Sequence, residues 1–485
     1  MVQLQRLLAT LTAASGWMQR HASSANVTTS PWGGGPPAVD PQDPHFLVSP
    51  SLNGTQLASF YPVGYYPCID GVVHQDPGQL EAFYQLLIDQ QVASGVNYMR
   101  QVLSMGQPAD ASSLPYEFAV ADSQRVDLRR FNQTHFAFWD RVLSYAAQHG
   151  VVVQLILLDA WHNKKWLVET DATMSWGLKY DFYVGRNNVN GINASTPQQW
   201  VDPAHPVFAV QQALLHKAVQ ALGHHPNLVW EVANEPSGHQ GRYAEWVNAL
   251  AETITAAETA YGHARHLVVP RDIPGHEFTP GHWNDNVSVV HEELVARWNG
   301  NGTAEVTPLL ADNDCCAPPS ALYARQRAWA ALTAGAQSSF LNVSIRDRAT
   351  LLAEDARSGM RDVGSVGSFV EALKVDLRGW SPADHLITSG WCIGRHSTKE
   401  YIVYLIDGGA TSLGAGAMSP LQSFSYVWFN PRTAEAEVAK IGHTDGVGGA
   451  KFDAPDNKDW ALYIAPKNDG GPTGANMMRS RLTAK

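Results

Sequence analysis

The sequence predicts a (β/α)8 barrel of the TIM type, followed by a C-terminal antiparallel β-sandwich. Eight short apolar runs alternate with helical segments between residues 63 and 377, and such regular alternation is typical of a parallel barrel. The run at residues 151–158 is almost wholly apolar, as expected for a strand buried on both faces of a parallel sheet. Beyond Trp380 the helical spacing stops, and strand-like runs separated by Gly, Asn and Pro turns predict a small sandwich.

Each element is expected from its local pattern of apolar residues and from its stop signals. The barrel strands are expected at residues 63–66, 96–100, 151–158, 228–232, 266–270, 286–291, 306–311 and 337–343. The helices are expected at residues 79–94, 134–149, 207–222, 242–261, 320–334 and 349–377, the last one broken around Gly364 to Gly367. A hairpin between residues 45 and 62 should close the barrel floor, and the sandwich strands should include residues 401–406, 424–429 and 460–464.

Length and composition limit the class of protein. A chain of 485 residues is too long for one ordinary domain. With 45% hydrophobic and 16% charged residues it is a well-cored globular protein. Its net charge of −11 argues against nucleic acid and anionic membranes as partners, since both need basic surface. No run after the N-terminus is long and apolar enough to span a bilayer.

The N-terminal residues and the glycosylation sequons indicate secretion. Residues 1–25 combine one positive charge, Arg6, before a short apolar core with a small-residue cleavage region, as in a signal peptide. Asn-x-Ser/Thr sequons begin at Asn26, Asn53, Asn132, Asn193, Asn286, Asn301 and Asn342. The four cysteines, Cys68, Cys315, Cys316 and Cys392, lack metal-site spacing, so one or two disulfides are expected in a secreted chain.

The stretch Asn227–Pro236 is the strongest functional signal. An apolar run of strand length is followed at once by Asn234, Glu235 and Pro236. Residues just beyond the carboxyl end of a strand form the reactive rim of a barrel. A carboxylate held there beside an amide is a candidate general acid, whereas the alternative is a plain turn that contains Glu.

Three segments together resemble the barrel glycoside hydrolases related to cellulases and β-mannanases: residues 96–100, 200–203 and 223–236. The resemblance covers roughly residues 55–345. It implies that Glu235 is the general acid/base, that Asn234 binds the sugar 2-hydroxyl and that Arg100 supports the nucleophile. It also implies a retaining mechanism with a carbohydrate substrate, and neither a metal nor an organic cofactor. Residues 385–466 resemble a β-sandwich that follows such barrels in some bacterial proteins and has been called a collagen-binding domain.

The expected domain division follows from these patterns. Residues 1–25 form the signal peptide, 26–380 the catalytic barrel, 381–466 the sandwich and 467–485 a disordered tail. A secreted, extracellular enzyme is the leading hypothesis. A non-catalytic carbohydrate-binding or adhesion protein on a degenerate barrel is the alternative.

The second carboxylate is where the sequence departs from the family pattern. Glycosidic cleavage needs two carboxyl groups that flank the bond, and the family places a Glu after strand seven, where this chain has Asp312, Asn313 and Asp314. Asp312 or Asp314 could be the partner of Glu235, if the backbone lies slightly closer to the substrate to compensate for the shorter side chain of Asp. Glu292 or Glu293 after the sixth strand could replace it, or the position could be empty.

Aromatic and imidazole side chains are expected around the barrel mouth. Tyr65 and Trp161 are candidates to stack on sugar rings, and His162 and His291 could hydrogen-bond sugar hydroxyls. Phe340 and Asp159 lie at comparable positions, and Asp159 could orient Arg100. Each of these residues could equally serve packing alone.

Overall fold

The structure of the protein is a computed structural model. It describes residues 35–50, 57–67, 77–103, 114–119, 125–159, 181–234, 242–273, 286–300, 306–313, 321–342, 345, 347–438 and 440–467.

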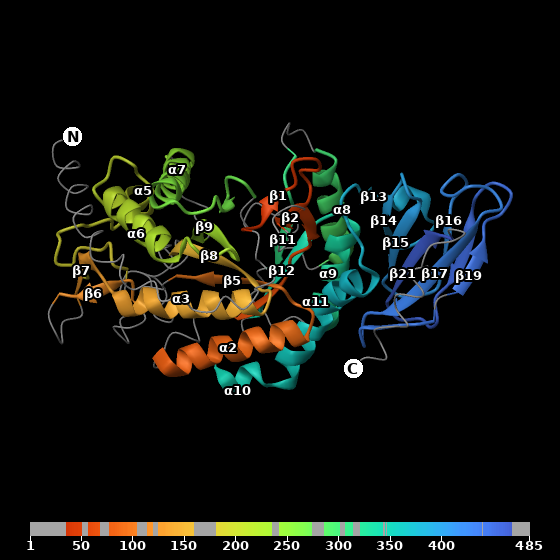
Figure 1. The fold of residues 1–485 in the computed structure, drawn as a ribbon, viewed down its shortest axis with the longest axis horizontal. Coiled ribbons are helices and arrows are strands. Elements are labelled where there is room, and N and C mark those ends of the chain that lie inside the picture. The colour runs from red at the N-terminus through yellow and green to blue at the C-terminus, as the bar shows by residue number, and fades with distance from the viewer. Residues whose placement is uncertain are drawn as a thin grey trace.

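A parallel sheet forms the centre of the first domain (Figure 1). Its seven described strands are β4 (Val63–Pro67), β5 (Tyr98–Val102), β8 (Val152–Asp159), β9 (Leu228–Asn234), β10 (Val268–Val269), β11 (Leu310–Asn313) and β12 (Gln337–Asn342). The strand order is β10-β9-β8-β5-β4-β12-β11, and all neighbours are parallel. The first and last strands of the chain order, β4 and β12, are therefore paired, as barrel closure requires. This confirms the predicted fold class.

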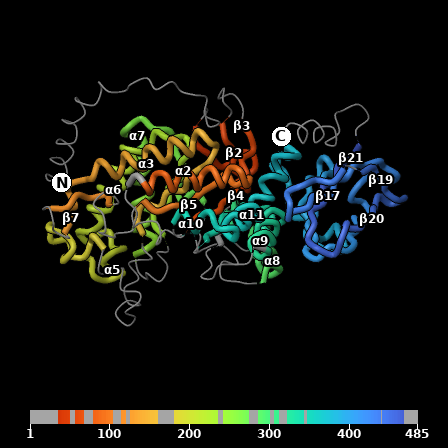
Figure 2. Tube along the Cα trace, turned by 90° about the horizontal axis from the view of Figure 1, so that it is seen from below, coloured from red at the N-terminus to blue at the C-terminus, as the bar shows by residue number. Residues whose placement is uncertain are grey.

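Helices follow the strands along the chain and pack outside the sheet (Figures 1 and 2). They are α2 (Pro77–Ala93), α3 (Gln133–Gln148), α5 (Pro197–Trp200), α6 (Val207–Leu222), α7 (Tyr243–Tyr261), α8 (Val287–Trp298), α9 (Ala321–Thr333), α10 (Arg348–Leu351) and α11 (Glu354–Leu373). Asn132 is the N-cap of helix α3, and its side chain accepts a hydrogen bond from the Thr134 amide. Helix α6 matches its predicted bounds at both ends.

The predicted sixth strand is wrong. Residues 287–291 instead begin helix α8, and the side chain of Asn286 caps it by accepting from the Ser288 amide. Val287, Val290, His291 and Leu294 are buried along one side of this helix, which is helical spacing. Between β10 and β11 the described residues contain no strand.

The predicted break in the last barrel helix is also wrong. Helix α11 runs unbroken through Gly364 and Gly367. A Cβ on Gly364 would lie 1.8 Å from the carbonyl oxygen of Ser94, and one on Gly367 would lie 2.2 Å from that of Gly95. These glycines therefore allow α11 to approach the turn after α2 closely, and they do not end the helix.

A small antiparallel sheet closes the barrel floor, as predicted. It consists of β1 (Ala38–Val39), β2 (Leu47–Pro50) and β3 (Leu57–Phe60). Leu47 and Phe60 pack in one buried cluster with Tyr98, Val152 and Val229 from the barrel strands. A separate hairpin of β6 (Tyr116–Phe118) and β7 (Val126–Phe131) precedes α3.

The C-terminal part is an antiparallel β-structure at one end of the molecule (Figure 1). Its elements are β13 (Ser381–Pro382), the 3-10 helix η7 (Asp384–Leu386), β14 (Trp391–Arg395), β15 (Glu400–Leu405), β16 (Ala410–Leu413), β17 (Ser423–Asn430), β18 (Glu435–Ala436), β19 (Lys440–His443), β20 (Ala450–Asp453) and β21 (Trp460–Pro466). Strands β16 and β20 form a second small sheet. The predicted sandwich is thus confirmed.

The main sandwich sheet buries both of its faces. On β15, Tyr401, Val403 and Leu405 belong to a core that also contains Phe452 of β20. The alternate residues Ile402 and Tyr404 belong to the large core of the barrel. Because side chains alternate along a strand, one face of this sheet packs within the sandwich and the other packs on the barrel helices.

Polar contacts join the two parts as well. The Arg325 guanidinium on α9 donates from Nε to Asp459 Oδ2 at 2.7 Å, and it also binds Asp362 of α11. Trp329 of α9 stacks on Tyr404 with ring centroids 5.3 Å apart. The contact between barrel and sandwich is therefore buried and specific.

Several further expectations concern the surface and the thiols. Cys392 is a buried free thiol in the sandwich core, and the other cysteines lie outside the described residues. Two sequon asparagines, Asn132 and Asn286, act as helix N-caps, and Asn342 is buried beside Tyr65. None of the described helices is long and apolar enough to cross a membrane.

Candidate active site

The inner face of the barrel changes from apolar to polar along its strands. Tyr98, Val152 and Val229 lie in the apolar layer above the floor. Two residues further along the same three strands stand Arg100, Gln154 and Glu231. Because side chains two apart share a face, these polar groups form the next layer towards the carboxyl ends of the strands. All three are buried.

Arg100 and Glu231 form the centre of this layer. Arg100 Nε donates to Glu231 Oε2 at 2.8 Å, and Arg100 Nη2 donates to Glu231 Oε1 at 2.6 Å. Gln154 Nε2 donates a third hydrogen bond to Glu231 Oε2 at 2.6 Å, and Tyr98 donates its hydroxyl to Gln154. A buried guanidinium needs such a paired counter-charge, and the two parallel bonds fix its plane.

Asn234 is fixed at the end of β9 by two neighbours. Its Oδ1 accepts from Arg100 Nη2 at 2.9 Å, and its Nδ2 donates to Asp159 Oδ1 at 3.2 Å. Asp159 ends β8 and is in register with Asn234. The amide therefore has a defined orientation, because its oxygen faces a cation and its nitrogen faces a carboxylate.

The remaining predicted groups are only partly described. Glu235, Asp314, Trp161 and His162 lie outside the described residues. The backbone of Asp312 lies in β11, paired with Ser339 of β12. The structure places Arg100 and Asp159 in hydrogen-bond contact with Asn234.

Tyr65 does not occupy the expected position for sugar stacking. Its side chain is 2% exposed, and Asn342 Nδ2 donates to its hydroxyl. A Cβ on Gly359 of α11 would lie 2.4 Å from the Tyr65 hydroxyl oxygen. The ring therefore packs between the sheet and α11, and the expectation that Tyr65 stacks on a sugar is wrong. Burial raises the pKa of Tyr65 to about 12.

His291 is also misplaced by the prediction. It lies on α8, where Nδ1 is 3.0 Å from the Ala330 carbonyl oxygen and Nε2 is 2.9 Å from Asp384 Oδ2 of the sandwich. Its ring stacks on Trp391 with centroids 4.6 Å apart. His291 therefore joins barrel to sandwich. Glu292 and Glu293 are exposed on the same helix, which removes the basis for placing them after a sixth strand.

Glu231 and Gln154 were not among the predicted site residues. A signal for Glu231 was present: it is a single charged residue within the apolar run Leu228–Val232. A charge in the middle of a buried strand requires a partner. Arg100 was a candidate partner for this charge, because its strand is separated from the strand of Glu231 by only one other strand.

Comparisons with known proteins support the fold. Residues 81–317 match the family model for cellulase, glycosyl hydrolase family 5. A solved glycoside hydrolase shares 13% identity at a TM-score of 0.60 and covers 91% of this chain and 99% of that one. A glycoside hydrolase family 5 structure from Bacteroides vulgatus shares 12% identity at a TM-score of 0.61 and covers 90% of this chain and 94% of that one. No curated protein matches the chain.

Proposed function

Because the barrel of this chain resembles the cellulases of glycosyl hydrolase family 5, we propose that it is a glycoside hydrolase that cleaves O-glycosidic bonds of a poly- or oligosaccharide. One observation carries the proposal. The Arg100–Glu231 pair and Asp159 hold Asn234 at the carboxyl end of β9, and Glu235 is the next residue. This is the end of a barrel at which active sites are built.

In the proposed mechanism Glu235 is the general acid/base. It protonates the leaving oxygen in the first step and activates water in the second. Asn234 presents its amide to a sugar hydroxyl, with its orientation set by Arg100 and Asp159. These positioning contacts exist without substrate, so little reorganisation is needed when the sugar binds.

The proposed partner carboxylate is Asp312 or Asp314. Strand β11, which carries Asp312, is separated from β9 by β10 and by the gap in the described sheet. Carboxyl ends of parallel strands lie on one rim, so the two strands can supply groups to opposite sides of the barrel mouth. A retaining mechanism requires about 5–5.5 Å between the two carboxyl groups, and an inverting one about 6.5–9.5 Å.

The test uses a panel of aryl glycosides and polysaccharides. Wild type should release sugar from at least one of them, and Glu235→Gln should reduce kcat at least about 1,000-fold, a loss of roughly 4 kcal/mol in transition-state stabilisation. Glu292→Gln, an exposed position on α8, is the matched control and should retain activity. Sugar binding without turnover across the panel would support a non-catalytic carbohydrate-binding protein instead.

A second experiment identifies the partner and the stereochemistry. Asp312→Gly and Asp314→Gly are assayed with an activated aryl glycoside in the presence of azide. If the chosen Asp is a nucleophile, azide restores turnover in that variant alone and yields a glycosyl azide. NMR of the first-formed product of wild type gives the anomeric outcome, and an inverted product would refute retention.

A further inference from the structure

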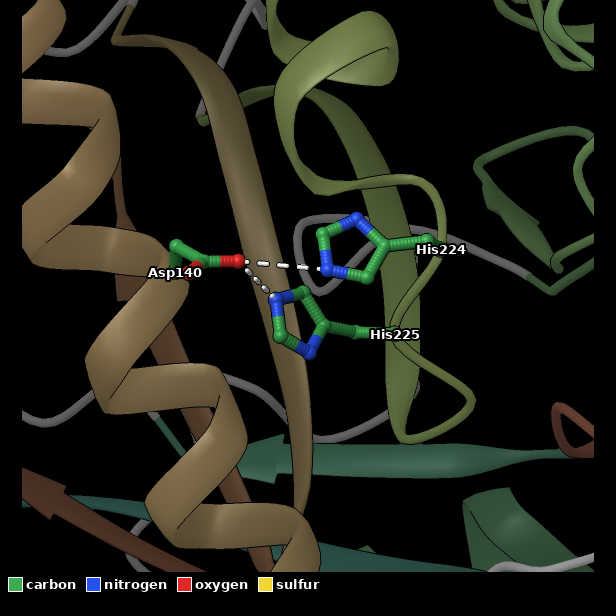
Figure 3. Close-up of side chains that lie close together, drawn as sticks. All are labelled: Asp140, His224 and His225. Atoms are coloured by element: carbon green, nitrogen blue, oxygen red, sulfur yellow. Dashed lines mark hydrogen bonds and ion pairs between the residues drawn. The ribbon is translucent and has the colours of Figure 1, made fainter. Parts of the chain in front are cut away.

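We propose that Asp140, His224 and His225 form a binding site for a divalent transition-metal ion such as Zn²⁺, at the end of the barrel opposite to the candidate active site. Asp140 lies on α3, and the two histidines lie between the end of α6 and the start of β9. One ligand atom from each residue falls within 4.8 Å of the others. Figure 3 shows both imidazole edges directed at the same carboxylate.

The distances are close to those of a coordination site. Asp140 Oδ1 lies 2.8 Å from His225 Nε2 and 3.2 Å from His224 Nε2. In a tetrahedral zinc site with bonds of about 2.0–2.1 Å, neighbouring ligand atoms are about 3.3–3.4 Å apart. Shifts of several tenths of an ångström in the two exposed side chains would therefore admit an ion.

The donor set suits a metal of the zinc type. Two imidazole nitrogens and one carboxylate oxygen are ligands that Zn²⁺, Ni²⁺ and Cu²⁺ accept, whereas Ca²⁺ and Mg²⁺ prefer oxygen ligands alone. The side chains of His224 and Asp140 are 54% and 44% exposed, which gives an ion and a water ligand access. The side chain of His225 is 6% exposed and provides the fixed ligand.

Surrounding contacts hold the loop in place before an ion arrives. The backbone carbonyl of His225 lies 2.9 Å from His266 Nε2, and His266 Nδ1 lies 2.8 Å from Glu258 Oε1. Asn227 Nδ2 donates to the carbonyl oxygens of Leu143 on α3 and Val151. These contacts fix the backbone that carries the two histidines.

The competing explanation is that the cluster only forms structural hydrogen bonds. One Asp–His hydrogen bond would suffice to connect α3 to the loop before β9. Here two imidazoles, with ring centroids 4.1 Å apart, approach the same carboxylate oxygen, so that three donor atoms lie within 4.8 Å of one another. The two explanations differ in what added metal does, and this difference can be measured.

The ion would serve stability and not bond cleavage. The histidines precede β9, whereas Asn234 ends it. The seven residues of β9 span six steps of about 3.3 Å, which separates the two sites by roughly 20 Å. An ion here would link α3, α6 and β9 at the closed end of the barrel.

The experiment is calorimetric titration of ZnCl₂ into the full chain, purified without a histidine tag and treated with chelator. Wild type should bind one Zn²⁺ at this site and show a higher Tm with zinc. Asp140→Asn and His224→Ala should each weaken binding at least about 10-fold, since loss of a ligand costs more affinity than loss of a hydrogen bond to a ligand. His443→Ala, which removes an exposed histidine of the sandwich, should leave binding unchanged.

Two outcomes would overturn the proposal: wild type that binds no zinc, or ligand variants that bind it as tightly as wild type. Circular dichroism without metal checks that each variant folds. Should a variant unfold, Co²⁺ added to wild type gives an independent reading. A tetrahedral visible spectrum that zinc displaces supports the site, and an octahedral spectrum refutes it.

Discussion

Arg100 and Glu231 face each other across the barrel interior with two hydrogen bonds, of 2.8 Å from Nε and 2.6 Å from Nη2. The same guanidinium holds Asn234 at 2.9 Å. The pair therefore fixes the position of Asn234, the residue before the proposed acid, relative to strand β5.

Glu231→Gln should reduce both stability and activity. The change removes the carboxylate charge that pairs with the buried Arg100 guanidinium, which costs about 3–5 kcal/mol. Displacement of Asn234 should lower kcat by about 100-fold. Urea unfolding and steady-state kinetics measure the two effects. Glu258→Gln is the matched control, because Glu258 is also buried but binds Trp230 and His266. This variant should destabilise the protein without lowering kcat of the folded fraction.

His291→Ala should destabilise the protein and leave kcat unchanged. The substitution removes a buried side chain that contacts Asp384 and stacks on Trp391, with an expected cost of about 1–3 kcal/mol. Thermal unfolding and kinetics at a temperature where the variant is folded check this. A large fall in kcat with unchanged Tm would instead support the original expectation that His291 binds sugar.

Gly364→Ala should lower the free energy of unfolding by about 1–3 kcal/mol, although Ala favours an isolated helix by about 1 kcal/mol. The reason is the 1.8 Å approach of a new Cβ to the Ser94 carbonyl oxygen. Gly446→Ala, where the Cβ would meet nothing within 4 Å, is the control and should be nearly neutral. A stabilised Gly364→Ala variant would contradict the close packing of α11.

Asp376 should contribute stability at neutral pH that is lost in acid. Burial alone would raise the pKa of Asp376, but hydrogen bonds from the Arg378 side chain and backbone outweigh it and lower the pKa below its ordinary value of 3.8. Since the folded-state pKa is depressed, the contribution is complete above about pH 5 and disappears as the pH falls below 3.8. Urea unfolding of wild type and Asp376→Asn between pH 3 and 7 measures it. The difference between them should become smaller in an Arg378→Gln background, where the backbone hydrogen bond remains; a constant difference at all pH values would refute the assignment.

Strong local patterns were sufficient for most of the fold. Helix α6 and strand β8 have near-continuous periodic signals and appear within one residue of their expected bounds. Residues 286–291 failed because Val287, Val289 and Val290 favour a strand locally, whereas Asn286 as N-cap and the buried series of α8 favour a helix. Tertiary packing therefore favours the helix over the strand in this segment.

The site was predictable only in part. Arg100 and Asn234 were placed near the carboxyl ends of their strands, which lie on one rim of a barrel. Tyr65 failed because its strand position does not tell which face of the sheet it occupies, and the small residue opposite it, Gly359, lies almost 300 positions away. Likewise the role of Gly364 depends on a backbone contact that no local pattern encodes.

The sheet that buries both faces has a practical consequence. Removal of the chain after residue 380 would uncover the indole of Trp329 and leave Arg325 without the Asp459 carboxylate. The C-terminal strands are therefore part of the hydrophobic interior of the enzyme fold, and the smallest piece suited to expression, crystallisation or engineering is the barrel together with its sandwich.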